Sequence, residues 1–345
     1  MNRIVLAATA GAVGVAAAFV LPAAARAQSV EAFYAGRTIS VLVSSDPGGG
    51  YDAQARLMAR HIGRFIPGHP SLIVQNMPGG GGIVAANYLY NVAPQDGTAL
   101  GVVQRGVVTA QLTHQPGVRF EVARFTWVGN LASENSVMVA WHTAAVKTTA
   151  DLFVKPLIVG GTGATSDSEM GPRLYNAILG TRFKIISGYK GASDLILAME
   201  KGELEGSEWS WSNIKTRGVQ YLEQHKIVLL LQSAPTRAPD LSGVPTEMEF
   251  AKTEDARKVI ELFSAQKTIA RPVMAGPGLP PERRAALRKA FADMAADPAF
   301  RADAAKAKLE VDPMPGDAVE RVVDLIVSTP KDVADRFGAA VNPKR

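Results

Sequence analysis

Cysteine is absent from the 345-residue sequence, so no disulfide holds the fold together and a large apolar core has to do so alone. Histidine is scarce, and the five residues show no metal-ligand spacing: His61, His69, His114, His142 and His225. After Leu21, no apolar run approaches the roughly 18 residues that a membrane span needs. The sequence therefore predicts no metal, no other cofactor and no membrane span beyond the amino-terminal segment.

A strong charge of one sign is also lacking. The formal net charge is only +5, and two of the arginines, Arg3 and Arg26, lie in the amino-terminal segment. No block of Lys and Arg interleaved with aromatic residues occurs, which argues against a nucleic-acid partner. Hydrophobic residues make up 47% of the sequence, as is typical of a globular α/β protein. The length exceeds what one core usually holds, so two domains are expected.

The amino terminus has the pattern of an export signal. A basic start precedes an apolar, alanine-rich segment at 4–21, and Ala-Arg-Ala at 25–27 offers a small-x-small cleavage site. We therefore expect a signal peptide over 1–27 that is cleaved near Ala27, a mature chain from about Gln28, and a location in the periplasm.

Short apolar runs alternate with amphipathic stretches. Strands are expected at 39–43, 71–76 and 98–104, with helices at 53–65 and 82–93 between them. Glycine-rich turns from strand to helix favour βαβ units and a parallel sheet. A second block of strands and helices follows the stretch 125–141 and runs to 232, and helices are expected at 244–263, 279–307 and 317–337. A strand within 267–276 is expected to return the chain to the first sheet.

Three glycine-rich turns stand at strand ends, at 46–52, 77–82 and 160–168. In open α/β sheets ligands lie beyond the carboxyl ends of the strands, and glycine allows close approach of the backbone. Helix starts after such turns suit a carboxylate or phosphate, so the first two turns predict an anion clamp made mostly of backbone. Tight packing is the structural alternative for each turn. A nucleotide loop is disfavoured, because neither a P-loop nor the acid of a dinucleotide site is present.

Several side chains near these turns have a structural and a functional interpretation. Asp52 is expected to act as a helix N-cap, with indirect ligand contact as the second role. Asp46 either faces the cleft or is a solvated turn residue. Tyr189 either closes over a ligand or packs between domains. Alternation along 207–211 places Glu208 on the face opposite Trp209, so one of these faces lines the cleft and the other belongs to the core.

Catalytic patterns are missing. No Gly-x-Ser-x-Gly elbow occurs, and Ser166-Asp167 has no base nearby in the sequence. No pair of carboxylates suited to glycoside hydrolysis can be identified either. The sequence thus favours a binding protein over an enzyme.

The ordered set of motifs resembles the Bug family, the extracytoplasmic receptors of tripartite tricarboxylate transporters. The family pattern Pro-Gly-Gly-x-x-Asp-x-x-x-Arg appears from Pro47 to Arg56, and Asn-x-Pro-Gly-x-Gly-Gly appears from Asn76 to Gly82. A Pro-Asp-Gly-like turn follows at 94–97, with Gln95 as an extra residue. A Gly-x-Gly loop, Tyr-Lys-Gly at 189–191 and an acidic turn at 202–205 complete the order.

This resemblance implies an α/β periplasmic-binding-protein clamshell of the Venus flytrap type. Domain 1 would comprise 28–132 and 266–345, and domain 2 would comprise 133–265. A small organic carboxylate would lie in the cleft, and the receptor, a monomer, would dock on a permease of one large and one small subunit. The expected ligand-binding residues are Ser45, Asp46, Pro47, Gly48, Gly49, Gly50, Tyr51, Asp52, Pro78, Gly79, Gly80, Gly81, Gly82, Gly163, Ala164, Thr165, Ser166, Asp167, Tyr189, Gly191 and Glu208.

The sequence departs from the family pattern at two loops. Ser44-Ser45 replaces the usual proline and aromatic residue, Asp46 replaces a small or apolar residue, and Tyr51 is the available substitute for the aromatic lid. In the third loop, Thr165, Ser166 and Asp167 occupy the region where serine and then histidine are usual. Extra acids at a cleft repel a second ligand carboxylate, so we expect a ligand with at most one or two carboxylates, with a hydroxyl or amine as a further group. The alternatives are an exported hydrolase that uses the same cleft and a receptor that feeds a sensor kinase.

Overall fold

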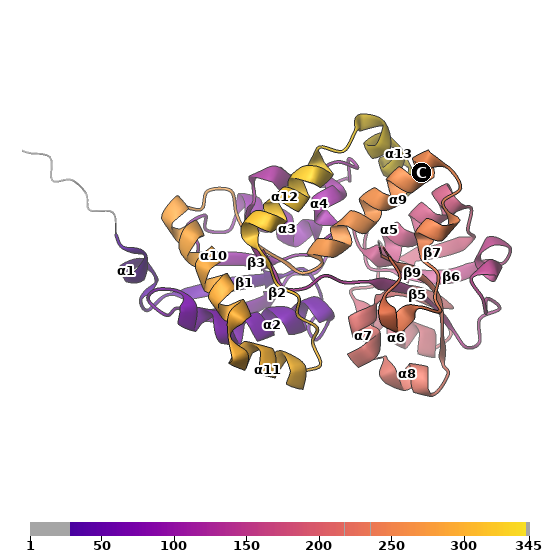
Figure 1. Cartoon of the computed structure of the whole chain (residues 1–345), viewed down its shortest axis with the longest axis horizontal. Coiled ribbons are helices and arrows are strands. Elements are labelled where there is room, and N and C mark those ends of the chain that lie inside the picture. The colour runs from indigo at the N-terminus through magenta and orange to yellow at the C-terminus, as the bar shows by residue number, and fades with distance from the viewer. Residues whose placement is uncertain (1–27, 217, 235, 343–345) are drawn as a thin grey trace, which may run out of the picture.

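The computed structural model describes residues 28–216, 218–234 and 236–342, and the predicted signal peptide lies outside this part. The chain forms two α/β lobes, each built on one sheet (Figure 1). The first lobe has the strand order β11-β4-β10-β3-β1-β2 and the second has β7-β6-β8-β5-β9.

The strands of the first sheet are β1 (Thr38–Val43), β2 (Ser71–Asn76), β3 (Ala99–Val102), β4 (Thr126–Asn130), β10 (Pro272–Ala275) and β11 (Met314–Pro315). Those of the second are β5 (Ser136–Trp141), β6 (Leu157–Gly161), β7 (Phe183–Ser187), β8 (Gly206–Ser210) and β9 (Ile227–Ser233).

The α-helices are α1 (Val30–Tyr34), α2 (Gly50–Ile62), α3 (Ile83–Asn91), α4 (Val107–Ala110), α5 (Asp167–Leu174), α6 (Ala192–Glu200), α7 (Trp211–Thr216), α8 (Val219–Glu223), α9 (Glu254–Ala265), α10 (Pro281–Ala296), α11 (Pro298–Lys306), α12 (Gly316–Val327) and α13 (Lys331–Val341). Short helical turns include η2 (Gly80–Gly82), η7 (Glu247–Phe250) and η8 (Gln266–Ile269).

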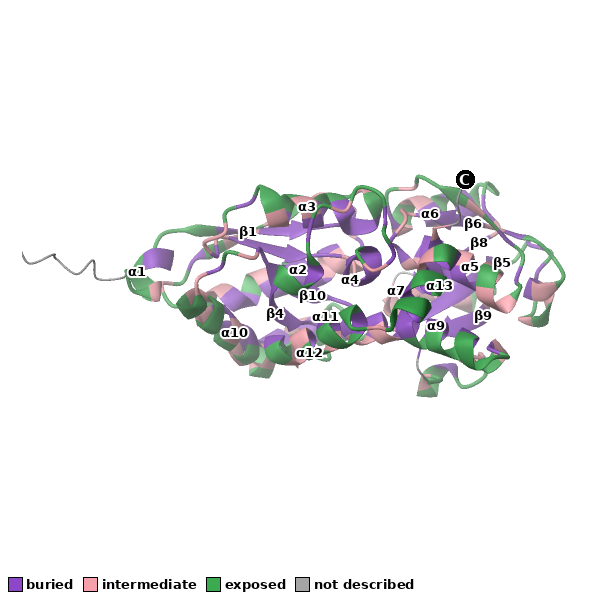
Figure 2. Cartoon of the chain, turned by 90° about the horizontal axis from the view of Figure 1, so that it is seen from above, coloured by how far each residue is buried: buried purple, intermediate pink, exposed green. Residues whose placement is uncertain are grey.

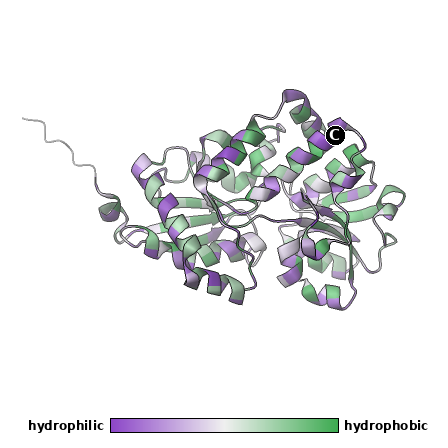
Figure 3. Cartoon of the chain, in the orientation of Figure 1, coloured by the Kyte–Doolittle hydropathy of each residue, from purple (hydrophilic) through white to green (hydrophobic). Residues whose placement is uncertain are grey.

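The predicted βαβ organisation of the first lobe is confirmed. β1 pairs in parallel with both β2 and β3, and α2 and α3 connect these strands. Val41 and Val43 are fully buried because both faces of this parallel sheet are covered by helices. Figure 2 shows buried strands between helices with exposed outer faces, and Figure 3 shows the same strands as largely hydrophobic.

The expected return strand is also confirmed. β10 lies antiparallel between β3 and β4, so residues from the last third of the chain complete the first sheet. The predicted helices at 279–307 and 317–337 are each divided in two. Pro298 and Pro330 divide them, because proline cannot donate the backbone hydrogen bond that would continue a helix. The predicted helix at 244–263 is η7 followed by α9, and Thr253 caps the latter by accepting from Ala256 N.

The chain passes between the lobes three times. The segments 131–135 and 266–271 run side by side and are joined by hydrogen bonds from Leu131 N to Arg271 O and from Glu134 N to Lys267 O, both 3.0 Å. The third passage is the link 328–330, because α12 packs on β4 in the first lobe whereas α13 packs on α5 and α9 in the second (Figure 1). The predicted domain boundaries place 331–341 in domain 1, and they remain a prediction.

Candidate functional site

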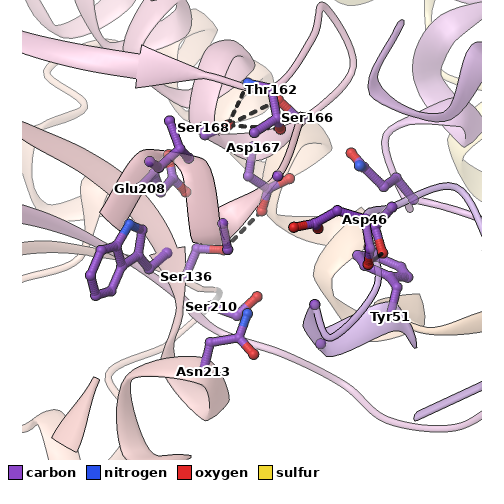
Figure 4. Close-up of a pocket in the computed structure, with 18 of the residues that line it drawn as sticks. Asp46, Tyr51, Ser136, Thr162, Ser166, Asp167, Ser168, Glu208, Ser210 and Asn213 are labelled. Carbon is purple, nitrogen blue, oxygen red and sulfur yellow. Dashed lines mark hydrogen bonds between the residues drawn. The ribbon is translucent and has the colours of Figure 1, made fainter. Parts of the chain in front are cut away.

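A cavity of about 110 Å³ lies between the two lobes. This is several times the space that one water molecule needs. Its lining residues come from strand ends and helix starts of both lobes, as the sequence predicts (Figure 4). They are Ser45, Asp46, Gly49, Gly50, Tyr51, Gln104, Arg105, Gly106, Ser136, Thr162, Thr165, Ser166, Asp167, Ser168, Gly191, Ala192, Leu195, Ile196, Glu208, Trp209, Ser210, Asn213 and Arg271.

The first glycine turn forms one wall of this cavity. A Cβ at Gly50 would lie 2.8 Å from Asn213 Oδ1 of the second lobe, so the two lobes approach closely at this turn. Tyr51 accepts a hydrogen bond from Arg105 N at 3.2 Å, and the Arg271 guanidinium lies 4.3 Å from the centre of its ring. This is a cation–π contact, which fixes the aromatic residue at the wall.

Asp52 has a structural role, but it is not the N-cap; Gly49 occupies that position. The Asp52 carboxylate accepts from Gly48 N at 2.7 Å, Arg56 Nε at 2.9 Å and Asn76 Nδ2 at 2.8 Å. Burial alone would raise the pKa of Asp52, but these hydrogen bonds lower it. Asp52 therefore holds the first turn in shape from outside the cavity.

The second glycine turn contacts the other lobe and does not line the cavity. Thr165 Oγ1 donates to Gly81 O at 2.7 Å and lies 3.2 Å from Gly80 O. A Cβ at Gly81 would lie 2.4 Å from Thr165 Oγ1, and one at Gly163 would lie 2.3 Å from Gly81 N. The backbones of the second and third glycine turns are thus in contact, and this contact joins the two lobes.

The predicted site residues divide into two groups. Those that line the cavity are Ser45, Asp46, Gly49, Gly50, Tyr51, Thr165, Ser166, Asp167, Gly191 and Glu208. Those that do not are Pro47, Gly48, Asp52, Pro78, Gly79, Gly80, Gly81, Gly82, Gly163, Ala164 and Tyr189. Tyr189 packs instead against the apolar core of the second lobe.

Asp46 reaches across the cleft from the first lobe. A Cβ at Gly191 of the second lobe would lie 2.0 Å from Asp46 Oδ1. Figure 4 shows the Asp46 carboxylate directed into the cavity, towards the side on which Asp167 lies. The cavity therefore has an acid on each lobe.

A buried charged cluster forms the floor of the cavity. Lys267 Nζ lies 2.5 Å from Asp167 Oδ2 and 3.3 Å from Glu208 Oε1, and Arg105 Nη2 also donates to Asp167 Oδ2. Burial alone would lower the pKa of Arg105 and raise that of Asp167, but their mutual attraction reverses both shifts. Asp167 is therefore held ionised by two cations.

Two further acids of this region are not held ionised. Burial raises the pKa of Glu208 to about 8, although Lys267 lowers it. Burial likewise raises the pKa of Glu247 to about 7, although it accepts hydrogen bonds from Ser233 at 2.9 Å and Ser264 at 2.8 Å. Near neutral pH these carboxyl groups carry protons for much of the time.

Several residues that line the cavity carry buried polar atoms without a hydrogen-bond partner in the described part of the chain. Arg105 Nε, Trp209 Nε1 and Arg271 Nε are buried donors without a hydrogen-bond partner among the residues that the structure describes. Glu208 Oε2 is a buried oxygen in the same condition. Unpaired buried polar atoms are costly, so a bound molecule that accepts from these donors would relieve that cost.

Sequence reasoning missed the cations of the site. Arg105 directly follows the predicted strand 98–104, and Lys267 and Arg271 lie within the segment 267–276 that was expected to return to the first sheet. Each residue lies beside a predicted strand. A position at a strand end was therefore the one feature of the sequence that could have indicated these residues as site residues. Ser136, the first residue of β5, carried no comparable signal.

No group of His, Cys, Asp or Glu suited to holding a metal ion occurs among the described residues. Within the same part of the chain, no helix combines the length and the apolar character needed to cross a membrane.

Comparison with solved structures gives the fold. The periplasmic binding protein BugD matches with a TM-score of 0.69 at 19% identity, over 89% of this chain and 98% of that one. An R. palustris protein with adipate matches with a TM-score of 0.68 at 20% identity, over 88% and 98%. MatC from Rhodopseudomonas palustris with bound malate matches with 0.66 at 19% identity, over 87% and 99%. The expected clamshell is thereby confirmed.

Comparison of sequences gives the family. A UPF0065 protein in the gbd 5'region of Cupriavidus necator is 26% identical over 254 residues, which cover 71% of this chain and 72% of that protein. The family model described as tripartite tricarboxylate transporter family receptor matches residues 66–332. This match spans most of the chain and confirms the resemblance seen in the motifs. The chain belongs to the family of tripartite tricarboxylate transporter receptors.

Proposed function

We propose that this protein is a periplasmic receptor that captures a small organic acid in the cavity between its lobes. The observation that carries the proposal is the set of buried donors without partners, Arg105 Nε, Trp209 Nε1 and Arg271 Nε, on residues that line the cavity between the lobes. A ligand carboxylate accepts hydrogen bonds and suits such donors. Solved structures of the same fold with adipate and malate support this class of ligand.

The ligand carries few carboxylates. Asp46 and the ionised Asp167 both line the cavity, and like charges a few ångströms apart are costly. Each buried cation of the site already has an acidic partner, as with Arg271 and Glu134 at 3.0 Å. The site therefore suits an acid with one or two carboxylates, and a hydroxyl or amine of the ligand would donate to Glu208 Oε2.

A receptor fits this site better than the alternative of an exported hydrolase. Ser136 Oγ lies 3.1 Å from Lys267 Nζ, which is the spacing of a nucleophile and a base. Lys267, however, donates to Asp167 and Glu208 as an ammonium group, and the low pKa of Asp167 makes that carboxylate a poor proton acceptor. Ser136 thus has no effective base beside it.

In this proposal the segment 1–27 directs export and is removed, and the mature monomer delivers its ligand to a permease of one large and one small subunit. Family membership supports the transporter role. The alternative of a receptor that feeds a sensor kinase uses the same binding site. Co-purification of the receptor with the permease, as against the kinase, distinguishes the two partners.

The test is a thermal-shift screen of the chain from Gln28 onward against mono-, di- and tricarboxylates, aromatic acids and amino acids, followed by calorimetry. A true ligand raises the melting temperature in a saturable way and is recovered unchanged. Asn213→Ala, at the cavity wall, should weaken a hit at least tenfold, whereas the exposed Gln224→Ala should not. A hit that is consumed, or an absence of any shift, contradicts the proposal.

A further inference from the structure

One carboxylate oxygen, Asp167 Oδ2, accepts from three buried donors. Lys267 Nζ lies at 2.5 Å, Ser136 Oγ at 2.8 Å, and Arg105 Nη2 is the third. The donors also contact one another, because Ser136 Oγ accepts from Arg105 Nη2 at 2.7 Å and from Lys267 Nζ at 3.1 Å. The result is a compact ring of two cations and one hydroxyl around a single anion.

The donors and the anion come from different parts of the molecule. Arg105 follows β3 of the first lobe, whereas Ser136 directly follows the passage 131–135 and Lys267 lies in the passage 266–271. Their exposed fractions are 3%, 1% and 1%. Asp167 begins α5 of the second lobe. The Arg105 guanidinium and the Lys267 ammonium are both buried and converge on one point. An anion is required there, since buried cations without a partner are strongly destabilising.

We infer that Arg105, Ser136 and Lys267 form an anion site that the protein fills with its own carboxylate, Asp167. Asp167 thereby acts as a specificity-determining residue that excludes acids needing a carboxylate at this point. The statement about ligands rests on the proposed function, whereas the anion site itself does not.

A ligand carboxylate would have to displace that of Asp167 to use this site. Displacement would leave a second carboxylate close to the first, beside Glu208, which also lines the cavity. Such an exchange gains no new pairing for the cations and adds one unpaired anion. The ligand therefore binds through other donors of the cavity, among them Arg271 Nε and Trp209 Nε1.

Formate is the probe that tests the anion site. Asp167→Ala removes Cγ, Oδ1 and Oδ2, and these are the heavy atoms that formate supplies. We expect saturable binding of formate to this variant by calorimetry and a rise in its melting temperature of about 2 °C or more at saturation, with chloride at equal ionic strength as the reference. The wild type, whose anion site is filled by Asp167, should bind formate at least tenfold more weakly than the variant does, and acetate should bind the variant more weakly because of its extra methyl group.

Two matched variants control the experiment. Glu249→Ala removes an exposed carboxylate that pairs with Arg237, and formate should not stabilise it. Asp167→Asn fills the site with an amide and should bind formate no more tightly than the wild type does. Should Asp167→Ala not fold in chloride, its recovery in formate is the supporting result, and Asp167→Ser provides a second variant with an emptied site.

The inference is overturned if formate neither binds nor restores Asp167→Ala and Asp167→Ser, or if it stabilises Glu249→Ala equally. These outcomes are separate from failure of the proposed function. A wild-type protein that binds no organic acid contradicts the receptor proposal but leaves the formate result standing. A wild-type protein that binds an acid, together with an Asp167→Ala variant that ignores formate, contradicts only the anion site.

Discussion

Arg271 and Glu134 form an ion pair in which Nη2 lies 3.0 Å from Oε2 and both side chains are almost completely buried. The two residues lie on neighbouring passages of the chain between the lobes. Arg271 also contacts the Tyr51 ring at the cavity wall. The pair therefore joins the passages to the site. Because both side chains are buried, water cannot solvate one charge if the other is removed.

Glu134→Ala should lower the free energy of unfolding by about 3 kcal/mol, because it leaves the Arg271 charge buried without its acid. Urea unfolding of the ligand-free protein measures this loss. Asp335→Ala is the control, since the exposed Lys331–Asp335 pair contributes at most about 1 kcal/mol. Equal losses in the two variants would contradict the importance of burial.

Gly106→Ala should hinder closure of the lobes without disturbing the local backbone. The residue has an ordinary φ of −61°, but an added Cβ would lie 1.8 Å from Thr165 O in the other lobe. We expect a larger radius of gyration by X-ray scattering and at least tenfold weaker binding of any acid found in the screen.

The control for Gly106→Ala is Gly243→Ala, where an added Cβ meets nothing within 4 Å. This variant should match the wild type in both measurements. A Gly106→Ala protein with wild-type dimensions and affinity would show that the contact between Gly106 and Thr165 is not needed for binding.

Glu208→Gln should reduce the pH dependence of stability. The folded-state pKa of Glu208, about 8, is raised by burial above the ordinary value of 4.5. The folded state therefore holds a proton that the unfolded state releases, and stability falls as the pH rises from about 4.5 to about 8. Groups around it that also carry charge are Lys267, Asp167 and Glu247.

Urea unfolding at pH 5 and pH 8 measures this effect. The wild type should lose on the order of 2 kcal/mol more than Glu208→Gln between these two values. An equal loss in both proteins would mean that Glu208 keeps an ordinary pKa in the folded state.

Asp46→Asn should increase the affinity for dicarboxylates relative to monocarboxylates about tenfold, because it removes one negative charge from the cavity wall. Calorimetry with pairs of acids of equal chain length gives the ratio. Asp324→Asn, on the exposed surface of α12, controls for the overall change in charge. A ratio that stays constant would contradict repulsion by Asp46.

Much of the fold follows from local sequence patterns. The apolar run at 39–43 and the glycine turn after it predict a strand, a turn and a helix, and β1 and α2 confirm them. The return of 267–276 to the first sheet is confirmed as β10. Local hydrophobic periodicity and turn chemistry carry this information, so one sequence is sufficient to read it.

The site was less predictable because it depends on tertiary contacts between segments that are far apart in the sequence. Asp46 and Tyr51 line the cavity as expected, but Gly80 and Gly81 of the second glycine turn contact Thr165 of the other lobe instead. Lys267 lies 100 residues from Asp167 along the chain, and only the passage of the chain between the lobes brings the two together. No local sequence pattern indicates such a long-range contact.

The three passages between the lobes lie close to one another, since Thr268 and the link at 329–330 line the same groove beside α9. Three neighbouring passages favour a hinge motion in which the lobes rotate about a single axis. A single distance between two labels, one on α3 and one on α6, would then describe the state of the whole molecule. In the proposed transporter, the permease would then need to sense only this one distance to distinguish a loaded receptor from an empty one.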